Sequence, residues 1–382
     1  MTCRGSVIGL GVAAVQFLSC GGGPGQPKQL AEIPVPNSPS KFVFDIGYAD
    51  QAGHYFIADR TNKSVDMFDS KTYSSIAIIT GGFAGQDPGG NNDKSGPDGV
   101  VGIPGTSTLY VGDVSSVKIV DSSAKAVTKN IQITPPGSNT PSGFRADEGC
   151  YDPDDKLMMF AHPGDSPPFI SWISTDTQAV VTQLALPGSS GLEQCAYDPG
   201  TKSFLINNDG TTANPDGELD VITASSVTAK APAVKTAYAL PKCSPAGLVL
   251  GPGTDVLVGC APASGNPLTS LILNRTNGAS VATVNLAGAD QVAYDSSSNR
   301  YFMALRFWVD TGTSIGGSAP ATSYNPILGV VDAGSHTIVA KLPAGSNDHS
   351  VAVDASNHRV FVPHTVGIAA FPSPGITVYS SQ

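Results

Sequence analysis

Residues 352–364, AVDASNHRVFVPH, decide the fold. A short apolar strand runs into a polar turn at 354–358, and a second strand, RVFVPH, returns from it. Residues 293–305, AYDSSSNRYFMAL, repeat the same order of apolar and turn-forming residues. Apolar runs of this length, separated by turns rich in Asp, Ser and Asn, are typical of antiparallel β-hairpins. Both stretches are therefore expected to be hairpins of one repeated β unit.

The second strand of this hairpin recurs along the whole chain. Its copies are FIAD at Phe56, YVGD at Tyr110, MFAH at Met159, LINN at Leu205, LVGC at Leu257, FMAL at Phe302 and FVPH at Phe361. A third strand follows each copy and a fourth follows most, at a spacing of about 50 residues, which is the period of a β-propeller blade. The sequence therefore predicts an all-β, seven-bladed propeller with four-stranded blades.

The seventh unit reaches only a third strand before the chain ends. Residues 30–36, LAEIPVP, resemble fourth strands such as VAKLPAG at 339–345. A ring closed by a strand from the other terminus removes the exposed edges that favour aggregation. Residues 30–382 are therefore expected to form one domain, with 30–36 completing the last blade.

Composition agrees with this class and excludes others. The 382 residues include 43 Gly and 30 Pro, a density that breaks helices and marks turns. The net charge of −10 repels phosphate backbones and argues against nucleic-acid binding. The sequence has no Walker loop and no CxxCH motif, so neither a nucleotide nor a haem cofactor is expected.

The second-strand pattern resembles that of the YVTN-repeat family of seven-bladed propellers, over roughly residues 30–382. GIPGTSTLYVGD at 102–113 and LGPGTDVLVGC at 250–260 depart from it, because they lack the Asp before the turn. The resemblance implies the propeller fold. It leaves function open, since related propellers include secreted binding proteins and, more distantly, gluconolactonase-like hydrolases.

The first residues have the pattern of an export signal. Arg4 precedes an apolar run at 7–18, which suits a signal peptide and is short for a membrane span. The run ends in FLSC, which resembles a bacterial lipobox. We expect a signal peptide at 1–19, lipidation of Cys20 and a flexible tether at 20–29, with a soluble secreted product as the alternative. The expected location is the periplasm or the outer membrane, where the lipid anchor would be the only membrane contact.

Export to an oxidising compartment gives the remaining cysteines a role. Cys243 and Cys260 flank a hairpin turn at 251–252, so they are expected to pair across it. Cys150 and Cys195 lie in the first strands of neighbouring blades, offset by one aligned position. Either a second disulfide or two buried thiols fits that pair.

Aligning the first strands on their turns brings acidic residues to one position. The first strand of each blade lines the central channel, and side chains at equivalent positions point the same way. The aligned residues are Phe44, Asp98, Asp147, Glu193, Ala246, Asp290 and His349, with Glu148 next to Asp147. Crowded carboxylates must bind a cation, pair with a base or keep protons, unless solvent screens them at a wet channel mouth.

A divalent cation is one way to satisfy this ring. The metal hypothesis assigns it to Asp98, Asp147, Glu148, Glu193 and Asp290. Oxygen ligands alone suit Ca²⁺ or Mg²⁺, whereas added histidine would favour Zn²⁺ or Mn²⁺.

The last residue of each second strand is predicted to lie at the same mouth of the channel. Those positions hold Asp59, Asp113, His162, Asn208, Cys260, Leu305 and His364, and long insertions follow several of them. Loops on a rigid scaffold commonly carry binding sites. The predicted ligand-binding residues are Asp59, Asp113, Asn208, His364, Arg306 and Trp308, the last two able to pair with or stack on an organic anion.

Two functions are consistent with these positions. The first is binding of a small molecule or an envelope protein at the channel mouth, by a monomer, with or without a divalent cation. The second is implied by the gluconolactonase-like resemblance: metal-dependent hydrolysis of a lactone or ester, with His349 or His162 as the base. His54, His336 and His358 fall in turns on the opposite face and are expected to be ordinary surface residues.

Overall fold

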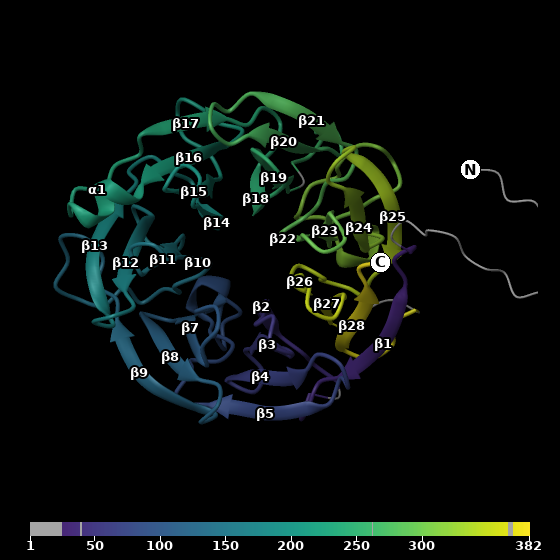
Figure 1. The fold of residues 1–382 in the computed structure, drawn as a ribbon, viewed down its shortest axis with the longest axis horizontal. Helices are drawn as coiled ribbons and strands as arrows, with labels where there is room; N and C mark the ends of the chain where they lie inside the picture. The colour runs from purple at the N-terminus through teal and green to yellow at the C-terminus, as the bar shows by residue number, and fades with distance from the viewer. Residues whose placement is uncertain (1–24, 39, 262, 366–369) are drawn as a thin grey trace, which may run out of the picture.

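Seven four-stranded antiparallel sheets form a closed ring, so the predicted seven-bladed propeller is confirmed (Figure 1). The computed structural model describes residues 25–38, 40–261, 263–365 and 370–382. The predicted signal peptide and the predicted lipidation site at Cys20 lie outside these residues. Within the described part of the chain, no helix is both long and apolar enough to cross a membrane.

In blades 1 to 6 the four strands run outward from the channel in chain order. Blade 1 consists of β2 (Phe44–Ala49), β3 (His54–Asp59), β4 (Ser64–Asp69) and β5 (Ser75–Thr80). Blade 2 consists of β6 (Val100–Gly102), β7 (Thr108–Asp113), β8 (Ser116–Asp121) and β9 (Ala126–Gln132). Blade 3 consists of β10 (Gly149–Asp152), β11 (Leu157–His162), β12 (Phe169–Ser174) and β13 (Ala179–Ala185). Blade 4 consists of β14 (Leu192–Asp198), β15 (Ser203–Asn208), β16 (Glu218–Thr223) and β17 (Thr236–Ala239). Blade 5 consists of β18 (Pro245–Leu250), β19 (Asp255–Cys260), β20 (Ser270–Asn274) and β21 (Ser280–Val284).

Blade 6 consists of β22 (Val292–Asp295), β23 (Arg300–Leu305), β24 (Ile327–Asp332) and β25 (Thr337–Pro343). Blade 7 consists of β26 (Ala352–Asp354), β27 (Arg359–His364), β28 (Gly375–Ser380) and β1 (Gln29–Pro34). The short helices are η1 (Asn92–Lys94), α1 (Ala224–Thr228) and η2 (Ala321–Ser323).

Burial explains why the second and third strands are almost continuously apolar. The strands β7 and β11 are buried along nearly their whole length, because neighbouring blades cover both faces of each sheet. Trp172 of blade 3, for example, packs edge-on against Phe204 of blade 4. Outer strands such as β13 stay partly exposed. The polar residues of the β26–β27 turn fit its backbone conformation. Asp354 accepts a hydrogen bond from the backbone N–H of Ser356 at 3.0 Å, and His358 adopts a positive φ of 60°.

The ring closes where the sequence predicted. Strand β1 pairs antiparallel with β28, placing Ile33 opposite Ile376, and lies outermost in blade 7 (Figure 1). Ile33 is buried in a cluster that contains Phe44, Phe361 and Val378. A strand from the N-terminal end of the domain thus covers the edge that the last blade would otherwise expose.

Both predicted disulfides form. Cys243 and Cys260 have a Cα–Cα distance of 4.7 Å and close the hairpin of blade 5. Cys150 of β10 and Cys195 of β14 have a Cα–Cα distance of 5.8 Å and link the inner strands of blades 3 and 4. The second bridge resolves the alternative of free thiols, because the two inner strands run side by side around the axis.

Candidate functional site

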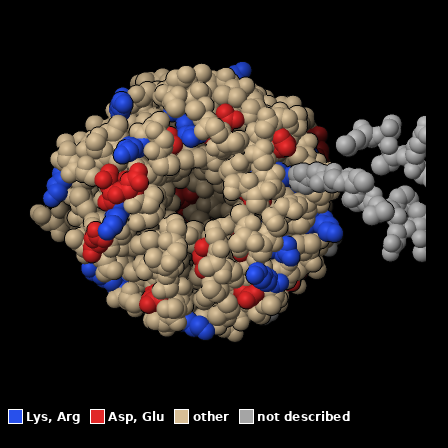
Figure 2. All heavy atoms as spheres, in the orientation of Figure 1, with Lys and Arg blue, Asp and Glu red and all other residues tan. Residues whose placement is uncertain are grey.

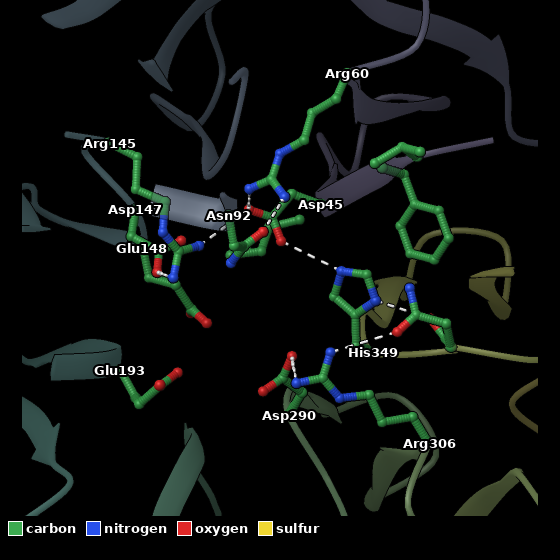
Figure 3. Close-up of a pocket in the computed structure, with 14 residues that line it drawn as sticks. Asp45, Arg60, Asn92, Arg145, Asp147, Glu148, Glu193, Asp290, Arg306 and His349 are labelled. Carbon is green, nitrogen blue, oxygen red and sulfur yellow. Dashed lines mark hydrogen bonds and ion pairs between the residues drawn. The ribbon is translucent and has the colours of Figure 1, made fainter. Parts of the chain in front are cut away.

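A cavity of about 360 Å³ lies on the propeller axis, where the inner strands begin (Figure 3). Figure 2 shows the ring hollowed at its centre. The cavity is lined by Val43, Phe44, Asp45, Ile46, Arg60, Asn92, Arg145, Asp147, Glu148, Glu193, Asp290, Arg306, Asn347 and His349. Charged side chains therefore dominate a space large enough for a small organic molecule.

Two of the cavity acids lie where the pairing of the inner strands is irregular. The β2–β3 register shifts between Phe44 and Gly47, and the β14–β15 register shifts between Leu192 and Cys195. Asp45 and Glu193 lie inside these two shifts. A β-bulge re-aims side chains that would otherwise point sideways toward the neighbouring blade.

The structure brings most of the predicted first-strand set together. Phe44, Asp147, Glu193, Asp290 and His349 line the cavity, as does Glu148. Asp98 lies behind its wall, fully buried. The aligned position thus marks the cavity, but the acids are not equivalent, because some have basic partners and others do not.

Arg60 holds one side of the cavity. Its Nη2 pairs with the carboxylates of Asp45 and Asp98, and its Nη1 donates to Asn92 Oδ1 at 2.6 Å. The side chain is only 4% exposed, so these contacts replace the water that it loses. Burial would raise the pKa of Asp45, but Arg60, the hydrogen bond from His349 and Arg145 together hold that pKa well below its usual range.

Arg145 extends the same cluster. Its Nη2 is 2.8 Å from Asp147 Oδ2 and its Nη1 is 3.6 Å from Asp45 Oδ2. Its Nε reaches Asp93 at 3.2 Å. Burial still raises the pKa of Asp147 to about 7, against the lowering effect of Arg145. Two guanidinium groups thus compensate the buried acids on this side of the cavity.

Three of these acids could in principle hold a metal ion. Oxygens of Asp45, Asp98 and Asp147 lie within 4.8 Å of one another, and an all-oxygen set suits Ca²⁺ or Mg²⁺. Arg60 and Arg145 already pair with these three carboxylates, so an ion there would compete with two guanidinium groups. Among the described residues, Glu148, Glu193 and Asp290 belong to no such convergent group. The arrangement therefore fits arginine-compensated carboxylates better than a metal site.

Glu148 and Glu193 point into the cavity, and among the described residues neither forms an ion pair with a basic side chain (Figure 3). Gln291 Nε2 donates to Glu148 Oε2 at 3.3 Å, and among the described residues no hydrogen bond or ion pair reaches the Glu193 carboxylate. The pKa of Glu148 is raised well above its usual range, mainly by burial and next by the charge of Asp147. The pKa of Glu193 is raised well above its usual range, mainly by burial and next by the charge of Asp209. Among the described residues, neither carboxyl group forms an ion pair with a basic side chain, and their raised pKa values favour the protonated form. A positive charge placed between them would lower both pKa values and favour the ionised form.

Arg306 pairs with Asp290 across the cavity rim. Its Nη2 lies 3.1 Å from Asp290 Oδ2, and its guanidinium lies over the Phe307 ring at 4.5 Å. The predicted role of Arg306 at the mouth of the channel is consistent with this position. Trp308, predicted beside it, points elsewhere: it donates to Asp310 Oδ1 at 2.9 Å and lies under Lys341 in a separate surface hollow.

His349 stacks on Phe44 and uses both ring nitrogens. Its Nδ1 lies 2.8 Å from the carbonyl oxygen of Asn347, and its Nε2 lies 3.3 Å from Asp45 Oδ1. Both ring nitrogens are thus engaged by oxygen atoms of the protein, so His349 offers no free nitrogen to a water molecule in this arrangement.

The predicted second-strand residues lie within the blades and do not line the cavity. His162 Nε2 contacts Ser171 Oγ at 2.8 Å, and Asn208 Nδ2 donates to Asp220 at 3.1 Å. Asp113 pairs with Lys118, Asp59 accepts from Asn62, and His364 bonds Glu32. The second strand is one strand spacing farther from the axis, and its side chains point toward neighbouring blades. Burial also lowers the pKa of His162 to about 3.

Of the remaining histidines, His336 and His358 lie in turns as predicted, whereas His54 is the first residue of β3; each has a polar partner. His54 contacts Asp50 at 2.7 Å, His336 contacts Asp255 at 2.8 Å, and His358 contacts Ser297 at 2.9 Å. None of the three lines the cavity.

Five polar cavity residues were not predicted from the sequence: Asp45, Arg60, Asn92, Arg145 and Asn347. Two signals were available. Arg60 directly follows the end of a second strand, and Arg145 stands two residues before Asp147, in FRAD. A basic residue beside an aligned acid indicates an internal ion pair, which would have separated the compensated acids from Glu148 and Glu193.

Buried acids in blade 1 make stability depend on pH. Burial, and then the charge of Asp59, raise the pKa of Asp66 to about 8 from 3.8. The folded chain therefore keeps a proton that the unfolded chain has lost between about pH 4 and pH 8. This contribution to stability is fully present below about pH 4 and is lost progressively as the pH rises to about 8. A shift of about four pKa units corresponds to about 6 kcal/mol.

We expect the melting temperature to fall between pH 5 and pH 8.5, and Asp66→Asn to flatten that profile. Asparagine keeps a polar side chain beside Ser64 but has no proton to lose. Circular dichroism melts at pH 5, 7 and 8.5 measure the change, with Asp176→Asn on the exposed surface as the control. Equal profiles for the wild type and Asp66→Asn would contradict the assignment.

Comparison with known proteins supports the fold and names no family. No family model and no curated protein matches the chain. Among solved structures, hydrazine synthase from Kuenenia stuttgartiensis is similar, with a TM-score of 0.63 over 86% of this chain and 94% of that chain. The sequence identity is 16%, so the likeness shows the fold alone.

Proposed function

We propose that this propeller is a binding protein for a small organic cation, held in the axial cavity. One observation carries the proposal: Glu148 and Glu193 face the cavity without a basic partner, while the other cavity acids pair with Arg60, Arg145 or Arg306. An ammonium group between the two glutamates would supply the missing positive charge and hydrogen-bond donors.

An organic amine suits the site better than a bare metal ion. The cavity holds about 360 Å³, far more than one ion fills, and its convergent carboxylates are already bonded to guanidinium groups. An amine can place its charge near Glu148 and Glu193 while its carbon skeleton fills the remaining space. A divalent cation is kept as one arm of the test.

Binding is also a better proposal than ester or lactone hydrolysis. The hydrolase hypothesis needs a free base beside the substrate, and both nitrogens of His349 are engaged by oxygen acceptors. His162 lies inside blade 3, away from the cavity. We propose a location in the cell envelope, which the two disulfides support. Lipidation of Cys20, a monomeric state and an envelope protein partner remain proposals.

Calorimetric titration with butylamine, butyrate, Ca²⁺, Mg²⁺, Zn²⁺ and Mn²⁺ tests the proposal. Butylamine is expected to bind, and butyrate is not. Glu193→Gln is expected to weaken butylamine binding by about tenfold or more, because it removes a charge-assisted contact. Binding should strengthen as the pH rises, since the raised pKa values of Glu148 and Glu193 keep these groups protonated at low pH.

Asp176→Asn, far from the axis on the exposed surface, is the matched charge-removing control and should bind like the wild type. Tight binding of a metal ion that excludes the amine would overturn the organic-cation proposal. So would equal affinity of the wild type and Glu193→Gln for butylamine.

A further inference from the structure

A second, smaller hollow opens beside the cavity rim. It holds about 190 Å³, and Phe307, Tyr324, Ala319, Ala321 and Pro326 contribute to its wall. The rings of Phe307 and Tyr324 meet edge to face at 5.1 Å. The Tyr324 hydroxyl donates to the carbonyl oxygen of Gly316, so the ring presents carbon to the hollow. This side pocket suits an apolar group.

The side pocket and the cavity share Arg306 and Asn347. Arg306 thus stands at the junction. Its Nη2 pairs with Asp290 and its Nη1 donates to Asn347 Oδ1 at 3.5 Å, while its buried Nε has no hydrogen-bond partner among the described residues. A guanidinium has five N–H donors, so a partly exposed arginine between an acidic cavity and an apolar pocket is a site for an anionic group.

The Asp290–Arg306 pair is also the cavity ion pair most open to a ligand. The side chain of Arg306 is 24% exposed and that of Asp290 is 22% exposed, against 4% for Arg60 and 12% for Arg145. A partly exposed carboxylate beside a partly exposed guanidinium is complementary to an ammonium beside a carboxylate. An α-amino acid carries those two groups on one carbon, so it can pair with both partners at once.

We propose that the ligand is a free α-amino acid with an apolar side chain. Its ammonium group binds among Asp290, Glu193 and Glu148, its carboxylate binds Arg306, and its side chain enters the pocket of Phe307 and Tyr324. This inference rests on the proposed amine binding and adds two requirements to it: a carboxylate and an apolar group.

Four compounds separate these requirements in calorimetric titrations of the wild-type protein. Phenylalanine has all three groups, 2-phenylethylamine lacks the carboxylate, 3-phenylpropionate lacks the amine, and glycine lacks the side chain. Phenylalanine is expected to bind about tenfold more tightly than each of the others, since each lost group removes a charge-assisted contact or apolar burial.

Two variants assign the groups to residues. Arg306→Gln is expected to weaken phenylalanine binding by about tenfold and to leave 2-phenylethylamine binding unchanged or stronger. Arg306→Lys, which keeps the charge, should retain most of the affinity. Ala321→Phe fills the side pocket from an exposed position, so the fold should tolerate it. It should lower the affinity for phenylalanine toward that of glycine, whose own affinity should not change.

The outcomes distinguish the two proposals. Equal binding of phenylalanine and 2-phenylethylamine, each weakened by Glu193→Gln, would overturn the amino-acid inference and leave amine binding standing. Unchanged phenylalanine affinity in both Arg306→Gln and Ala321→Phe would also overturn it. Failure of every amine and amino acid to bind the wild type would overturn both proposals.

Discussion

Replacing Arg60 with methionine is expected to lower the free energy of unfolding by about 3–5 kcal/mol, because it breaks a buried ion-pair cluster from one side. Methionine keeps the length and much of the volume of the side chain but has no charge. Asp98 is fully buried and Asp45 is only 6% exposed, so both would lose their partner with little access to water. Urea denaturation followed by circular dichroism measures the loss.

Lys156→Met is the matched control. The Lys156–Asp176 pair has side chains that are 55% and 64% exposed, so losing it should cost about 1 kcal/mol or less. A second variant tests the cause. Adding Asp98→Asn to Arg60→Met removes one of the stranded charges and should recover part of the stability. A loss for Arg60→Met no larger than for the control would contradict the ion-pair account.

Removing the closing strand is the other change with a large expected effect. A chain that begins at residue 35 lacks β1, which exposes the backbone edge of β28 and removes Ile33 from its buried cluster. We expect a loss of about 5 kcal/mol or more, from the lost strand pairing and apolar burial together. The exposed edge should also cause self-association.

Urea denaturation and size-exclusion chromatography compare this chain with one that begins at residue 25. A synthetic peptide of residues 25–38 gives the specific control, because it can pair with β28 in trans and should restore part of the stability. A truncated chain that unfolds at the same urea concentration, and elutes as a monomer, would show that β1 does not hold the ring closed.

Much of the fold could be predicted because the necessary signals are local. Alternation of apolar and turn residues identifies each hairpin, and its recurrence identifies the blade and the count. The Cys243–Cys260 bridge was accessible for the same reason, since both cysteines flank one turn. Closure of the ring by β1 could be predicted because the last repeat lacked a fourth strand and the N-terminal part of the domain contained a spare one.

The aligned position in the first strands also located the cavity. Phe44, Asp147, Glu193, Asp290 and His349 all reach it, although they are far apart in the chain. The aligned position in the second strands did not, and His162 and Asn208 bond within their own blades. Alternation along a strand predicts which residues point to the same face of the sheet. It does not predict whether their side chains point into the central channel or pack against the next blade.

The sequence by itself therefore determined the seven blades, the closing strand and the acidic character of the channel, because strand periodicity and repeat spacing act over short distances. Only the tertiary structure decided which acids are compensated. Arg60 reaches Asp98 at the start of blade 2, and Arg145 of blade 3 reaches Asp45 of blade 1, along long side chains whose partners in other blades no local pattern specifies. Because these arginines pair with the aspartates, neither Glu148 nor Glu193 has an ion-pair partner among the described residues. This is the physical reason for the proposal that the cavity binds a cation.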